Sequence, residues 1–224
     1  MSEELKRQLV ETVVSHVKLR EEEFVAPVVK RSAGLFELLI AIILTQNTSD
    51  KNAFKAYYNL KGRLGIIEPQ SILSLSEEEL SQLIRPAGMH RGRARKLIEL
   101  SRSLLGHPLE EISRMSFEEA RKFLMDLPGV GEKTADVLLL NMGKPAFPVD
   151  THIKRIAARW SIGKSYREIS EWFRKNFPPT RYLEIHLKLI QFGRDYCRAQ
   201  RPRCDVCPVR HMCPWPGAGG RKKA

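Results

Sequence analysis

The 224-residue sequence predicts an all-α protein. Apolar residues recur at helical spacing along most of the chain, and no stretch alternates persistently between apolar and polar residues. Hydrophobic residues make up 42% and charged residues 29% of the chain, a balance typical of a globular protein rather than a disordered one. A chain of this length can bury a sizeable core, as one domain or as two small ones.

Three helices are predicted in the N-terminal third. Residues 5–19 carry an apolar stripe through Leu9 and Val13 at helical spacing. Gly34 precedes the sequence FELLIAIILTQ, which is apolar nearly all round. It therefore predicts a buried central helix. Residues 53–64 form the third helix, and short connections containing Gly or Pro separate these elements.

Two capping boxes open helices in the middle of the chain. Ser76 is followed by Glu79, and Ser116 by Glu119, so each pair can exchange side-chain-to-backbone hydrogen bonds at a helix start. Further helices are predicted at residues 93–105, 149–159, 166–177 and 180–192. The final segment, GAGGRKKA, predicts a disordered basic tail.

The charge of the chain favours a polyanionic partner. The formal net charge is +12 and the pI is about 9.7. Residues 191–224 contain eight Lys or Arg against two Asp, and residues 86–98 contain basic residues and no acid. A solvated surface is the alternative reading for isolated charges. Two acid-poor clusters in one basic protein indicate a nucleic-acid partner instead.

The cysteines form a single C-x6-C-x2-C-x5-C run, at Cys197, Cys204, Cys207 and Cys213. Thiolates this close in sequence can converge on one metal centre. Disulfides are disfavoured in a chain without a signal peptide. Zinc-ribbon sites usually show two C-x2-C pairs, whereas only one is present here. The spacing alone leaves an iron–sulfur cluster and zinc both open.

The sequence LPGVGEKTA, residues 127–135, lies between two predicted helices. Gly129 and Gly131 permit a tight hairpin with positive φ. Their missing side chains let a backbone approach, and the amides of Gly129, Val130 and Gly131 then point outward at the next helix's N-terminus. Such amides form an anion site suited to a DNA phosphate. A turn whose glycines serve geometry alone is the alternative.

Together with VDTH at residues 149–152 and the cysteine run, this hairpin resembles the endonuclease III family, helix–hairpin–helix DNA glycosylases with a [4Fe–4S] cluster. The segments FELLIAIILTQNTSD and GMHRGRARKL extend the resemblance to roughly residues 33–213. It implies two helical domains with a DNA-binding cleft between them. A six-helix barrel would span residues 33–146, and residues 1–32 with 147–224 would form the cluster domain, whose cluster loop is 197–213.

The resemblance also implies an activity. The chain would be a bifunctional DNA glycosylase and AP lyase of base excision repair, acting on oxidised or otherwise damaged pyrimidines. Such an enzyme extrudes the base and displaces it from C1′ with an amine, and the resulting Schiff base allows β-elimination. The resemblance assigns the amine to Lys133 and a charge-stabilising carboxylate to Asp150. A solvent-facing lysine and a helix N-cap are the alternative roles.

Side chains that fill the space of the extruded base are implied at two places. The chain reads TQNTSD where bacterial relatives read SAQATD, so either Gln46 or Asn47 takes one place. Met89 matches an apolar wedge, and a buried methionine is the alternative. We expect Arg91, Arg201 and Arg203 to contact the DNA backbone. Asp50 would hold the pocket or recognise the base, and His152 would order the site or take part in the chemistry.

Two other functions stay open. One is a monofunctional mismatch glycosylase, specific for adenine or for mismatched thymine or uracil, whose members carry Ser or Tyr where this chain has Lys133. The other is a non-catalytic iron–sulfur DNA-binding protein. The expected partners are a [4Fe–4S] cluster and double-stranded DNA with damaged bases or abasic sites. No apolar run approaches the roughly 20 residues that cross a bilayer, so we expect no membrane partner and a cytoplasmic, nucleoid-associated protein. We also expect a monomer.

Overall fold

The computed structural model describes residues 1–219, and every regular element within them is a helix. The predicted all-α fold class is therefore confirmed. The predicted disorder of residues 217–224 is wrong for residues 217–219, which end a 3-10 turn, and residues 220–224 lie outside the described residues. No helix among residues 1–219 is long and apolar enough to cross a membrane. The chain divides into two compact units, Met1–Arg20 with Pro145–Ala224, and Glu21–Lys144.

The unit Glu21–Lys144 is built around one buried helix. Its helices are α2 (Val25–Lys30), α3 (Leu35–Leu44), α4 (Asp50–Leu64), α5 (Pro69–Leu73), α6 (Glu77–Leu83), α7 (His90–Ser103), α8 (Phe117–Met125) and α9 (Glu132–Asn141). All of α3 from Phe36 to Leu44 is buried beneath α2, α4 and α9, as its apolar sequence predicts. Its one acid, Glu37, accepts a hydrogen bond from Tyr57 (2.6 Å) and pairs with Lys61 (2.8 Å). These partners make its burial tolerable.

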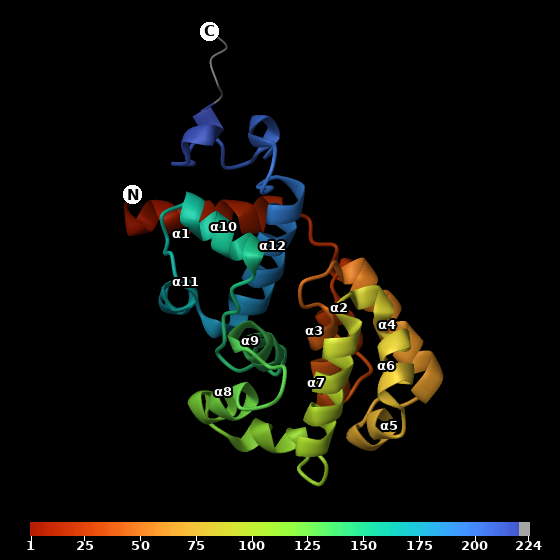
Figure 1. The fold of residues 1–224 in the computed structure, drawn as a ribbon. Coiled ribbons are helices and arrows are strands. Elements are labelled where there is room, and N and C mark those ends of the chain that lie inside the picture. Colours follow the sequence, from red (N-terminus) through yellow and green to blue (C-terminus); the bar gives the residue numbers. More distant parts are fainter. Residues whose placement is uncertain (220–224) are drawn as a thin grey trace. The chain divides into compact units, whose positions relative to one another are not determined.

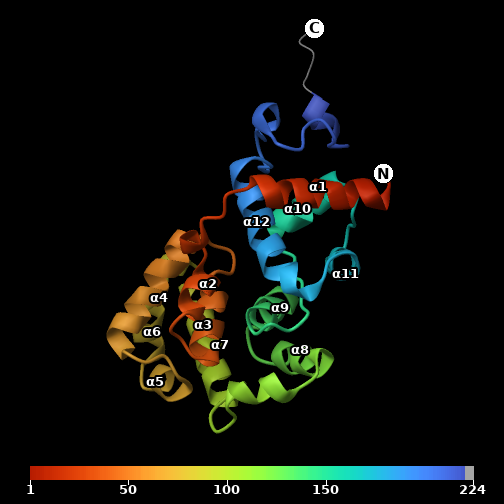
Figure 2. The same cartoon turned by 180° about the vertical axis from the view of Figure 1, so that it is seen from behind.

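The other unit joins the beginning of the chain to its end. Its helices are α1 (Glu3–His16), α10 (Thr151–Arg159), α11 (Tyr166–Asn176) and α12 (Tyr182–Asp195). The apolar stripe of α1 packs on α12, which also contacts α10, and both views show α1 beside α12 (Figures 1 and 2). Arg20 and Asp195 form a bidentate ion pair of 2.9 and 3.1 Å. The N-terminal segment is thereby tied to the helix that leads into the cysteine run.

The units differ from the predicted domains mainly at residues 21–32. The sequence interpretation placed this segment with the cysteine domain. In the structure α2 packs on α3 and α9, so the segment belongs to the unit that contains α3. It stays a prediction that the chain folds as two separate domains.

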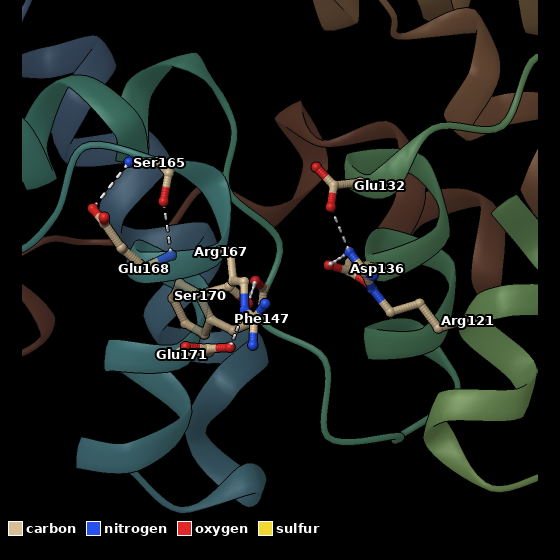
Figure 3. Close-up of polar contacts among 9 residues, drawn as sticks. All are labelled: Arg121, Glu132, Asp136, Phe147, Ser165, Arg167, Glu168, Ser170 and Glu171. Atoms are coloured by element: carbon tan, nitrogen blue, oxygen red, sulfur yellow. Dashed lines mark hydrogen bonds and ion pairs between the residues drawn. The ribbon is translucent and has the colours of Figure 1, made fainter.

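The two capping boxes predicted from the sequence can be compared with the hydrogen bonds at the helix starts. Ser116 and Glu119 form the complete predicted capping box, with hydrogen bonds of 3.2 and 2.9 Å. Ser76 accepts from Glu79 N–H (3.1 Å), but the Glu79 side chain pairs with Arg63 instead. A third box, at Ser165 and Glu168, was not predicted (Figure 3).

Candidate functional site

The predicted hairpin is a tight turn between α8 and α9. Gly129 adopts a φ of +80°, which only glycine accepts readily. The Val130 side chain is buried and its N–H donates to Leu127 O (3.2 Å). Among the described residues, the amides of Gly129 and Gly131 have no such acceptor. Together with the first turn of α9, these two amides can bind an anion.

Two side chains, those of Gln46 and Arg121, hold this turn in place. Gln46 donates from Nε2 to Gly129 O (3.0 Å) and to Thr134 Oγ1 (2.9 Å), which ties the end of α3 to the hairpin. Arg121 of α8 donates to the buried Asp136 of α9 (2.7 Å) and to Glu132 (3.2 Å), as Figure 3 shows. A rigid turn keeps its amides oriented before any ligand arrives.

A lysine from α7 lies against the same turn. A Cβ added at Gly129 would meet Lys96 Cβ at 3.5 Å, so the Lys96 stem packs on the hairpin. The sequence interpretation had counted Lys96 only as part of a charged cluster. Lys133, the second residue of α9, is half-buried and directly follows the turn.

The two predicted wedge residues are close neighbours. Asn47 (φ +53°) and Met89 (φ +50°) both adopt the left-handed conformation that larger residues rarely populate. Met89 is 69% exposed, which contradicts the alternative of a buried methionine, and its sulfur lies 4.0 Å from Asn47 Nδ2. Asn47 is exposed, whereas Gln46 is half-buried and bonded to the hairpin.

The buried Arg93 supports the turn before Asn47 and the turn before Met89. The Arg93 side chain donates to the carbonyls of Leu44 (3.1 Å), Ala87 (3.2 Å) and Gln46 (2.7 Å). Burial lowers the pKa of Arg93. Arg93 is thus an internal support rather than part of the basic surface suggested by its neighbours. Its spacing of four and seven residues from the buried Leu97 and Leu100 was the signal that could have found it.

Arg93→Met is expected to destabilise the fold by roughly 2–5 kcal/mol, because three carbonyls lose a charged donor inside the protein. Urea unfolding measures this. Arg91→Met, in the exposed first turn of the same helix, should change the free energy of unfolding by no more than about 0.5 kcal/mol. Equal stability of the two variants would contradict the internal role.

The other predicted support residues have structural contacts. Asp50 Oδ1 accepts from Val25 N–H (3.0 Å) and so caps α2. Asp150 caps α10, since its Oδ1 accepts from Ile153 N–H (2.8 Å). His152 Nδ1 lies 2.9 Å from Arg155 Nη2, and burial lowers the pKa of this histidine. A neutral imidazole accepting from the guanidinium fits both facts.

Helix α10, which begins after Asp150, contacts the first cysteine of the run through two arginines. Arg155 donates to Cys197 O (2.8 Å) and to Gly193 O (3.1 Å). One turn on, Arg159 Nη1 donates to Cys197 Sγ (3.0 Å). A thiolate gains from such charge-assisted donors. Sequence reasoning missed both arginines, which stand four residues apart on one helix face.

All four predicted cysteines line one pocket. Its other walls are largely aromatic, and the lining residues are Arg159, Trp160, Phe192, Tyr196, Cys197, Cys204, Cys207, Val209, Arg210, Cys213 and Trp215. Burial raises the pKa of Cys197 and Cys204, and it raises the pKa of Cys207 to about 11. Metal ligation would therefore displace protons from these thiols.

The lining fits an iron–sulfur cluster. The four cysteines surround a pocket that also has apolar walls, and Arg159 donates a hydrogen bond to the sulfur of Cys197. Thiolate ligands, apolar surroundings and donors to sulfur are features that suit such a cluster.

Comparison with known proteins accounts for this combination of hairpin and cysteine pocket. Residues 40–179 match the HhH-GPD superfamily of base excision DNA repair proteins. Residues 197–213 match the iron–sulfur binding domain of endonuclease III. The chain belongs to the HhH-GPD superfamily of base excision DNA repair proteins.

The similarity to individual proteins extends over most of the length of both chains. Endonuclease III of Sulfolobus acidocaldarius is 34% identical over 209 residues, 88% of this chain and 93% of that protein. Endonuclease III of Thermotoga maritima is also 34% identical, over 86% of this chain and 91% of its own. A trapped covalent intermediate of endonuclease III with DNA superposes with a TM-score of 0.78 at 30% identity, covering 95% of this chain and 96% of that one.

These findings confirm the predicted family and enzyme class. The chain is a base excision repair enzyme of the endonuclease III type, a DNA glycosylase and AP lyase, and DNA is its partner. The match over the cysteine run decides between the two metals left open, because it identifies an iron–sulfur binding domain. Cys197, Cys204, Cys207 and Cys213 would hold the cluster.

The purified protein is expected to be brown, with about four irons and four acid-labile sulfides per chain and no stoichiometric zinc. Cys207→Ala should yield colourless, poorly soluble protein, because the remaining thiols lose the group that organises their loop. Val206→Ala alters an exposed neighbour in the same loop and should keep the colour. Well-folded, zinc-loaded wild-type protein would overturn the assignment.

Proposed function

We propose that this enzyme removes oxidised or otherwise damaged pyrimidines from double-stranded DNA with Lys133 as its nucleophile, and cleaves the strand 3′ of the resulting abasic site. The observation that carries the proposal is the position of Lys133. It stands in the first turn of α9, immediately after the hairpin whose amides can bind a phosphate. A mismatch glycosylase of this type would have Ser or Tyr at this position.

The chemistry follows from an amine at that position. Lys133 Nζ forms a bond to C1′ as the bond from C1′ to the base breaks, and the base leaves with a proton. Opening of the sugar ring then gives an imine between Nζ and C1′. Loss of a proton from C2′ expels the 3′ phosphate and cleaves the strand. Asp150, held at the N-terminus of α10, stabilises the positive charge that develops on the sugar.

The geometry favours Asn47 over Gln46 as the residue that enters the duplex. Asn47 is exposed beside Met89, and the two project from strained turns supported by Arg93. Gln46 instead donates from Nε2 to Gly129 of the hairpin and to Thr134 of α9. Asn47 and Met89 therefore fill the space of the extruded base, and Gln46 positions the hairpin.

Contacts with the DNA backbone are spread over both units. In one unit the amides of Gly129 and Gly131 bind a phosphate, and Lys96 lies beside it. Val130 contributes a buried side chain that shapes the turn. Arg91, Arg201 and Arg203 are exposed and supply further positive charge. The proposed enzyme acts as a monomer on nucleoid DNA in the cytoplasm.

Incision assays on a panel of duplexes test the proposed function. The panel contains thymine glycol, dihydrouracil, uracil, mismatched thymine, 8-oxoguanine or an abasic site, each at one position. We expect base release and strand cleavage at the two oxidised or reduced pyrimidines, and strand cleavage at the abasic site. Base release without strand cleavage, confined to mismatched thymine or uracil, would support the monofunctional alternative.

Affinity for undamaged duplex is expected to fall steeply with salt, since each neutralised phosphate contributes about −0.9 to the slope of log K against log salt. Replacing Arg201 and Arg203 with Glu should reduce the magnitude of that slope by about 2 and weaken damaged and undamaged binding alike. Fluorescence anisotropy across a salt series measures both. Arg7→Glu with Arg167→Glu makes the same charge change on exposed helices of the same unit and should leave the slope nearly unchanged.

A further inference from the structure

The chain does not leave the cysteine pocket at its last cysteine. After Cys213 it passes through Pro214 and Trp215 into a short 3-10 turn, η6 (Pro216–Gly219), which contacts η5 (Cys204–Val206). The half-buried Trp215 is a wall of the same pocket as the cysteines. The match to the iron–sulfur binding domain ends at residue 213. Residues 214–219, called the C-terminal cover below, are therefore an addition to it.

The Trp215 ring holds an arginine that contacts a ligand sulfur. The guanidinium carbon of Arg159 lies 4.1 Å from the centre of the indole ring. The same guanidinium donates from Nη1 to Cys197 Sγ at 3.0 Å. An indole face attracts a cation and restricts where it can go. Trp215 thus fixes the position of the donor that Cys197 receives.

Gly217 shows that the turn is fitted to this ring. A Cβ at Gly217 would lie 2.2 Å from both Cη2 and Cζ3 of Trp215. No side chain can be accommodated there unless the indole moves. The backbone of the cover is therefore in direct contact with the ring, which leaves the ring little freedom to swing away from the pocket.

We propose that residues 214–219 cover the iron–sulfur cluster and protect it from oxygen, with Trp215 as a positioning residue that keeps Arg159 on Cys197. Solvent exposure and donors to sulfur govern how a cluster behaves. A ring that forms a wall of the pocket would limit the access of oxygen to a cluster held there. Trp215 also keeps the Arg159 guanidinium beside the sulfur of Cys197, where it donates a charge-assisted hydrogen bond.

The test follows the visible absorbance of the cluster in purified, cluster-loaded full-length protein in air-saturated buffer with EDTA. Trp215→Ala is expected to lose absorbance about 10-fold faster than wild type, and Trp215→Phe at a rate between the two. Gly217→Ala should also accelerate the loss, because its added methyl group displaces the indole of Trp215. Trp172→Ala, a change of the same size on α11, is the control and should resemble wild type.

A second arm under argon separates protection from simple structural support. Under argon, Trp215→Ala should keep its cluster as long as wild type does. Equal loss in air and under argon would overturn the proposal, because the cover would then be a structural clamp. Loss from Trp215→Ala and Gly217→Ala at the wild-type rate in air would also overturn it. Should Trp215→Ala fail to fold, Gly217→Ala and Trp215→Phe carry both arms.

Discussion

Borohydride is expected to trap the wild-type protein covalently on lesion-containing or abasic duplex, and Lys133→Gln is expected to abolish the adduct. An imine between Lys133 Nζ and C1′ is reduced to a stable amine, whereas glutamine has no amine to form one. Lys133→Gln should also lose strand cleavage. Binding should survive, because the change removes one of 38 basic residues.

Digestion and mass spectrometry locate the attachment, which should lie on the peptide that contains Lys133. Lys122→Gln, an exposed lysine on the preceding helix α8, is the matched control and should trap like wild type. Trapping that persists in Lys133→Gln would assign the nucleophile to another amine, such as the N-terminus. Base release by the wild type with no trapping would place the enzyme in the monofunctional class.

The features that sequence predicted well depend on local pattern. The burial of α3 follows from a run of apolar residues, and the hairpin follows from two glycines one residue apart. The cysteine pocket follows from four thiols in one short segment. In each case the residues that act together are neighbours in the chain, so their spacing carries the information.

The features that sequence missed depend on contacts between distant segments. Arg93 reads as surface charge among basic neighbours, yet it serves carbonyls from two other turns. Gln46 bonds to residues more than eighty positions away. The left-handed backbone at Met89 has no local signal either, because methionine rarely adopts it and tertiary contacts impose it. The motifs identify residues of the site, whereas these tertiary contacts determine where those residues lie.

Asp150→Asn is expected to slow base release by roughly 10²–10⁴-fold while leaving the fold intact. Asparagine caps helices about as well as aspartate, so its Oδ1 can still accept from Ile153 N–H and α10 should start at the same residue. The substitution therefore removes a negative charge with almost no change in volume. Single-turnover base release measures the loss, and thermal unfolding checks the helix.

Two further substitutions separate the cap from the charge at Asp150. Asp150→Ala loses both the cap and the charge. It should lose activity and should also lower the free energy of unfolding by about 1 kcal/mol. Asp205→Asn makes the same charge change at an exposed position of the cluster loop and should release base at the wild-type rate.

The Asp150→Asn enzyme should bind lesion DNA at least as tightly as wild type, since it carries one less negative charge near phosphates, yet turn it over slowly. Near-normal base release by Asp150→Asn would reduce Asp150 to a helix cap, and the stabilisation of the sugar cation would have to come from another group.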